Sequence, residues 1–96
     1  MNREVVVLPE ASADVVAAIA WYNRKVPGLG QAFLAEVNRQ IRRIRWFPDS
    51  YPPLGTTTRR SNLHRFPYAI AYRNLPSVIE VIAVFDCRID PNTYPD

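Results

Sequence analysis

The hydrophobic positions in the first half of the chain predict one strand followed by two helices. Three consecutive valines and then Leu8 favour a strand over residues 3–8, because β-branched side chains suit the extended backbone. From about residue 10 to residue 25, apolar side chains recur at steps of three and four, which predicts an amphipathic helix. A second helix is predicted over about residues 31–46, with an apolar stripe of Phe33, Val37, Ile41 and Ile44.

The second half of the chain predicts a sheet that covers these helices. Two helices joined by a short linker form an antiparallel hairpin, and its apolar stripes cannot all be hidden within the pair. After a proline-rich connection, the sequence predicts a short strand around residues 63–66, then strands over residues 68–73 and 78–85. The element order is β-α-α-β-β-β, which favours an α+β fold with the helical hairpin packed on an antiparallel sheet.

The last predicted strand has mostly apolar side chains on both faces, which predicts a central place in the sheet. Strict alternation puts Ile79, Val81, Ala83 and Phe85 on one face and Glu80, Ile82 and Val84 on the other.

Length and composition favour one domain spanning residues 1–96, with 48% apolar and 22% charged residues. The apolar runs are far shorter than a bilayer span, so we expect a cytoplasmic protein. Cys87 is the only cysteine and His64 the only histidine, which excludes an internal disulfide and a Cys/His metal cluster. We therefore expect neither a metal ion nor another cofactor.

Positive charge is concentrated in the middle of the chain. Residues 37–79 carry eight arginines against a single acid, although the whole chain has a net charge of only +3. Part of this charge alternates with aromatic and aliphatic side chains between residues 59 and 73, on a predicted hairpin. Such a strand can bury one face and offer the other to an anionic partner.

Several short motifs occur in a characteristic order over nearly the whole chain. They are Pro9, Glu10 and Ala11 with Asp14; Trp21 and Tyr22; Gly28, Leu29 and Gly30 with Phe33; Ile44 and Pro48; Arg59 and Arg60; Phe66, Pro67 and Tyr68 with Ile70 and Tyr72; and residues 81–84 before Arg88 and Pro91. In this pattern the chain resembles the RelE/ParE superfamily of toxins from type II toxin–antitoxin systems, of the plasmid stabilisation type. The resemblance implies the fold deduced above and a cognate antitoxin as partner.

The resemblance leaves two activities open. The ribonuclease branch of the superfamily, the mRNA interferases, cleaves messenger RNA on the ribosome without metal, whereas the ParE branch is associated with poisoning DNA gyrase. Metal-free RNA cleavage needs a base, an acid and cations around the phosphate. Many members end the last strand with a histidine, one residue, two arginines, a spacer and a proline, with an aromatic residue beyond.

This chain departs from that pattern. Arg88 and Pro91 match it, but Asp86 replaces the histidine and Ile89 the second arginine. We expect Asp86 to form an ion pair with Arg88, which would make its carboxylate a weak base. The remaining catalytic candidates are His64, Arg88 and Tyr94, and whether the protein is an enzyme stays open.

The sequence therefore favours a ParE-like toxin that binds DNA gyrase and is silenced by its antitoxin. We expect its target-binding surface to be one positively charged concavity formed by Arg60, Arg65, Arg73 and Arg88. One alternative is a ribosome-dependent mRNA endonuclease that uses these arginines with His64 or Tyr94 as proton carrier. Another is a degenerate member that folds and binds antitoxin but is not toxic.

Overall fold

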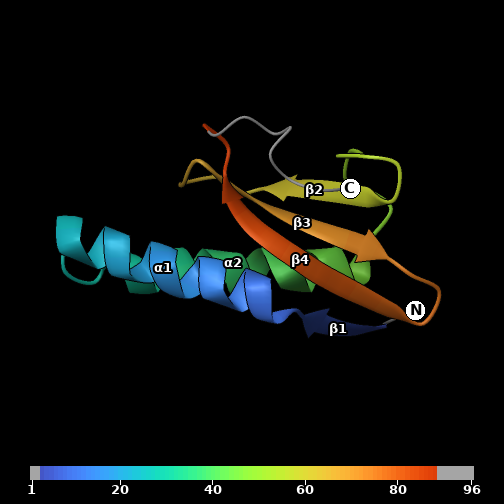
Figure 1. The fold of residues 1–96 in the computed structure, drawn as a ribbon, viewed down its shortest axis with the longest axis horizontal. Coiled ribbons are helices and arrows are strands. Elements are labelled where there is room, and N and C mark those ends of the chain that lie inside the picture. The colour runs from blue at the N-terminus through green and yellow to red at the C-terminus, as the bar shows by residue number, and fades with distance from the viewer. Residues whose placement is uncertain (1–2, 89–96) are drawn as a thin grey trace.

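The computed structural model describes residues 3–88. Its elements are β1 (Glu4–Val7), α1 (Pro9–Lys25), α2 (Leu29–Trp46), β2 (Thr58–Asn62), β3 (Tyr68–Asn74) and β4 (Val78–Asp86). The sheet order is β1-β4-β3-β2, and the two helices lie together against one face of this sheet (Figure 1). The predicted α+β fold, the element order and the central place of β4 are confirmed. Because β1 runs parallel to β4, the sheet is mixed rather than wholly antiparallel.

The hairpin between α1 and α2 depends on two glycines. Gly28 has a φ of +89°, a backbone conformation that strains residues with a Cβ atom and that glycine adopts easily. At Gly30 a Cβ would lie 2.5 Å from the carbonyl oxygen of Ile19, so glycine lets the helices approach closely. The Asn23 Oδ1 atom accepts hydrogen bonds from the amides of both glycines, at 3.1 and 2.8 Å, and fixes the turn.

The first strand of the second half is not where the sequence predicts it. A strand over residues 63–66 is wrong, because β2 occupies Thr58–Asn62 and pairs with β3. The amide of Leu63 still bonds to the carbonyl oxygen of Tyr68 at 2.9 Å, but the next two amides donate to the carboxylate of Glu36. These donors are thus satisfied by a side chain from α2 instead of a neighbouring strand.

The predicted alternation along β4 is also wrong beyond Val81. Ala71 pairs with Ala83 whereas Tyr72 pairs with Val81, so Ile82 is an extra residue in the ladder. This bulge turns Val84 toward the helices and Phe85 toward the opposite face. The amide of Val84 donates a 2.9 Å hydrogen bond to Asp14 Oδ2 of α1, which ties the bulge to the helix.

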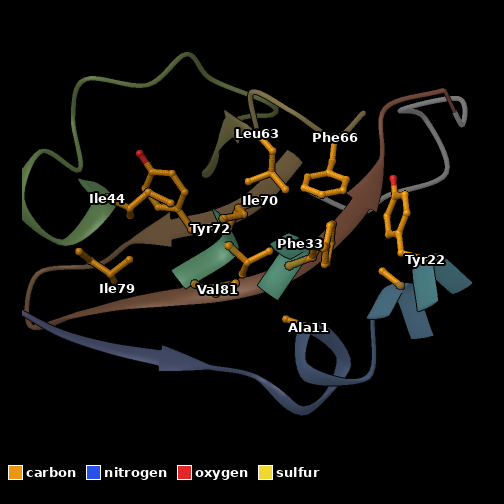
Figure 2. Close-up of a cluster of buried hydrophobic side chains, with 13 residues drawn as sticks. Ala11, Tyr22, Phe33, Ile44, Leu63, Phe66, Ile70, Tyr72, Ile79 and Val81 are labelled. Carbon is orange, nitrogen blue, oxygen red and sulfur yellow. The ribbon is translucent and has the colours of Figure 1, made fainter. Parts of the chain in front are cut away.

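The main hydrophobic core lies between the helices and the sheet. Figure 2 shows the rings of Tyr22, Phe33 and Phe66 grouped at one end, and Ile44 and Ile79 at the other. The Phe33 ring centroid lies 5.3 Å from that of Phe66 and 5.0 Å from that of Tyr68, in edge-on contacts. Such aromatic pairs add to the free energy gained by burial, so this end holds the hairpin to the sheet.

Tyr72 links the core to the connection before β2. Its side chain is fully buried, and its hydroxyl donates a 2.6 Å hydrogen bond to the carbonyl oxygen of Pro48. Burial raises the pKa of Tyr72 to about 12, because an ionised phenolate is poorly solvated there.

The Tyr72 pKa predicts a loss of stability in alkali. Above pH 10 the phenol ionises in the unfolded chain and not in the folded one, so the unfolded state binds fewer protons. The free energy of unfolding should therefore fall by about 1.4 kcal/mol per pH unit from this group as pH rises from 10 toward 12. Urea titrations at pH about 9 and about 11 should show a smaller fall in Tyr72→Phe than in the wild type. An equal fall in both proteins would contradict the assignment.

Candidate functional site

Two of the predicted target-binding arginines lie on the sheet face away from the helices, the outer sheet face. Ser61 contacts α2 through Gln40, so its neighbour Arg60 points the opposite way. The Arg60 guanidinium carbon lies 5.5 Å from the centroid of the Phe85 ring. Arg73 shares this face and forms an ion pair with Glu80 at 3.2 Å. Of these two arginines, only Arg73 is paired with a carboxylate among the described residues.

Arg88 forms the ion pair that the sequence predicts. Its Nε and Nη2 atoms donate to the two carboxylate oxygens of Asp86 at 2.9 and 2.6 Å, and its amide adds a third bond. These hydrogen bonds, chiefly those from the Arg88 side chain, lower the pKa of Asp86 below its usual value. A carboxylate with a lowered pKa is a weak proton acceptor at neutral pH.

The cavity beside this pair, the α1–β4 groove, has a volume of about 450 Å³ and includes Asp14, Trp21, Arg24 and Arg88 in its lining. Burial raises the pKa of Asp14, although the hydrogen bond from the Val84 amide acts in the opposite direction. The groove therefore mixes two arginines with two carboxylates, those of Asp14 and Asp86. It carries no marked excess of positive charge.

A smaller cavity beside β2, the β2 hollow, has a volume of about 330 Å³. Its lining includes Gln40 and Arg43 from α2, Tyr51, Arg60 and Asn62, and His64. Arg60 and His64 thus line one cavity together with Arg43, although the Arg60 guanidinium itself lies over Phe85 on the outer sheet face. The sequence marks Arg43 only as a flank of the second helix, because nothing in its local pattern shows that this turn of α2 lies beside β2.

Arg65 follows His64 in the exposed connection between β2 and β3. Its guanidinium carbon lies 5.3 Å from the centroid of the Phe66 ring. The amides of His64 and Arg65 both donate to the carboxylate of Glu36, a side chain only 3% exposed. Glu36 therefore holds both residues in place, a role that the sequence pattern does not indicate.

The expectation of one positively charged concavity is wrong for the described residues. Arg60 lines the β2 hollow, Arg88 lines the α1–β4 groove, and Arg73 is paired on the outer sheet face. Arg60 and Arg73 share the outer sheet face, whereas Arg88 lies at the α1–β4 groove beside Asp86, so the four arginines do not line one cavity. Tyr94, the remaining catalytic candidate, lies outside the described residues.

No group of three or more His, Cys, Asp or Glu side chains within residues 3–88 could hold a metal ion. Neither α1 nor α2 is long and apolar enough to cross a membrane.

Comparison with known proteins identifies the fold. The sequence matches no protein-family model and no curated protein. The structure is similar to a solved chain described as "Chromosomal ParDE TA system from P. aeruginosa", with a TM-score of 0.80 and 16% sequence identity. The match covers 88% of this chain and 96% of that chain. The resemblance noted in the sequence is thus confirmed at the level of structure, and the chain has the fold of a component of a ParDE toxin–antitoxin system.

Proposed function

We propose that this protein is the toxin of a type II toxin–antitoxin system, that it acts by binding DNA gyrase, and that a cognate antitoxin silences it in the cytoplasm. The sequence motifs and the fold both support a toxin–antitoxin component. The proposal requires no metal ion or cofactor.

One observation carries the choice of a binding toxin over a nuclease. Asp86 stands where many members of the resembled superfamily have a histidine, and Arg88 holds both of its carboxylate oxygens. Its lowered pKa leaves it ionised near neutral pH, so it is poorly suited to exchange a proton during RNA cleavage. Asp86, at the end of β4, is therefore better suited to an electrostatic contact than to acid–base catalysis.

Exposed apolar side chains are consistent with an antitoxin that covers the protein. Large exposed hydrophobic side chains occur on β1, on α1 and just after it, and at the end of α2. They are Val6, Val7, Val16, Trp21, Val26, Trp46 and Phe47. Burying such surface on a partner is favourable, and antitoxins of the resembled superfamily wrap their toxins with a helix and an extended tail.

The target-binding role is tested by gyrase supercoiling in the presence of the purified protein. We expect inhibition that increases with protein concentration. Arg60 and Arg65 have no carboxylate partner among the described residues, so Arg65→Gln should weaken inhibition by about tenfold, the effect of losing one charge-assisted hydrogen bond. Arg42→Gln, which removes an equal charge from the exposed face of α2, is the control. Full supercoiling at saturating protein contradicts the proposal.

A ribosome-dependent mRNA endonuclease is the second candidate, and one observation favours it. His64 and Arg60 both line the β2 hollow, and an imidazole and a guanidinium are the kinds of group that proton transfer and phosphate stabilisation require. Primer extension on translated messages distinguishes the two activities. A discrete set of cuts that disappears in Arg88→Ala or His64→Gln would establish the nuclease. Normal growth on induction without antitoxin would instead identify a degenerate, non-toxic protein.

A further inference from the structure

The face of α2 that points away from the core carries a continuous run of exposed side chains. Phe33, Val37 and Ile44 are buried and mark the inner face of the helix. On the opposite face, exposed residues follow one another at steps of four, three and four, the spacing of a single stripe on a helix with 3.6 residues per turn. They are Ala35, Arg39, Arg42 and Trp46, called here the α2 outer stripe.

The two arginines of the α2 outer stripe are unpaired within the described part of the chain. No ion pair or hydrogen bond among residues 3–88 uses the guanidinium of Arg39 or Arg42. The one acidic residue of α2 is Glu36, which is buried and accepts hydrogen bonds from backbone amides. The stripe therefore presents positive charge with no carboxylate from its own helix, and it attracts a carboxylate supplied by a partner.

The C-terminal end of the α2 outer stripe is aromatic. Trp46 is 58% exposed, and the next residue, Phe47, is 62% exposed. No aromatic pair within residues 3–88 includes either ring, and no hydrogen bond there uses the indole N–H of Trp46. Covering such side chains is favourable, and tryptophan and arginine supply much of the binding energy at protein interfaces. The stripe thus joins an aromatic anchor to two cations.

The spacing of the α2 outer stripe suits a second helix. Side chains at steps of three and four are the ones that interdigitate when two helices pack along each other. Ala35 is small, so it allows close approach of a partner at the N-terminal end of the stripe. A matching helix has carboxylates facing Arg39 and Arg42 and an apolar side chain facing Trp46.

Other occupants fit this surface less well. A second copy of the chain would bring the arginines of two stripes together, and like charges in contact repel. Helices that bind a membrane surface insert a whole apolar face, whereas the apolar face of α2 is buried in the core. The backbone of a nucleic-acid duplex could contact the arginines, but it offers no apolar surface to Trp46 and Phe47.

We propose that the α2 outer stripe docks an acidic amphipathic helix of a partner protein. Carboxylates of that helix pair with Arg39 and Arg42, and an apolar side chain packs on Trp46. The proposal goes beyond the proposed function, because the stripe contains none of the arginines assigned to target binding. It does not depend on gyrase binding.

The test uses synthetic helical peptides as long as α2, with glutamates at steps of three and four and one leucine whose position differs among the peptides. Binding is followed by the anisotropy of a labelled peptide and by Trp46 emission in a Trp21→Phe background. We expect a peptide to bind and to shift this emission to shorter wavelength, and its glutamine analogue not to bind. Arg39→Gln/Arg42→Gln should weaken binding about tenfold, the effect of two lost ion pairs. Trp46→Ala should weaken it at least tenfold.

Arg43→Gln/Arg45→Gln is the matched control. It removes the same charge from α2, but these two arginines lie on the flanks of the helix, where Arg43 donates to Gln40 and Arg45 to the carbonyl oxygen of Arg3. The control should change affinity less than twofold. All four arginines are exposed, so both double variants should keep the circular dichroism of the wild type.

Three results would overturn the proposal. One is that no peptide binds, and another is that the two double variants weaken binding equally. The third is that an oligonucleotide or an anionic vesicle binds through the α2 outer stripe and the peptides do not. The supercoiling assay contains no peptide, so failure of either proposal leaves the other standing.

Discussion

Phe33→Ala is expected to lower the free energy of unfolding by about 3–5 kcal/mol, the usual cost of deleting a buried phenyl ring. Phe33 is fully buried and contacts the rings of Tyr22, Phe66 and Tyr68. Its loss leaves a cavity between α2 and the end of the sheet that the rigid hairpin cannot close. A domain of 96 residues has a total stability of roughly 5–14 kcal/mol, so the variant should be close to unfolding.

Urea unfolding followed by circular dichroism measures this loss. Val16→Ala is the control, because Val16 is 66% exposed on α1 and its truncation should change stability by less than about 0.5 kcal/mol. A loss below about 1.5 kcal/mol in Phe33→Ala would mean that the aromatic cluster does not hold the hairpin to the sheet.

Glu36→Ala is expected to cost about 2–4 kcal/mol, because it removes the acceptor for two partly buried amides, those of His64 and Arg65. Glu36→Gln keeps one side-chain oxygen and should lose about half as much. Calorimetric unfolding of both variants measures their losses of stability and shows which is larger. The reverse order, or no loss in either variant, would contradict the role assigned to Glu36.

The helices and the general fold could be predicted because their signals are local. Long apolar stripes mark α1 and α2, and runs of β-branched and aromatic residues mark β1, β3 and β4. The strand β2 was missed because its sequence, residues 58–62, is polar and has no apolar alternation. It is a strand only through its pairing with β3 and the contact between Gln40 and Ser61. The bulge at Ile82 likewise depends on the pairing register of β3 and β4. It also depends on a hydrogen-bond acceptor distant in sequence, the Asp14 carboxylate.

The candidate site could be predicted only in part, for the same reason. The pairing of Asp86 with Arg88 follows from residues two apart on one strand end, and the structure confirms it. The contact of Arg60 with Phe85 and Cys87 depends on how β2, β3 and β4 pair, and the placement of Arg43 depends on how α2 packs beside β2. These are tertiary relations, and a single sequence carries no direct record of them.

The most direct test of a binding toxin is the superhelical density of a reporter plasmid isolated shortly after the protein is induced without antitoxin. Translated messages from the same cells are mapped by primer extension. We expect the plasmid to lose negative supercoils while the messages stay whole. A normally supercoiled plasmid together with messages cut at discrete positions would contradict it.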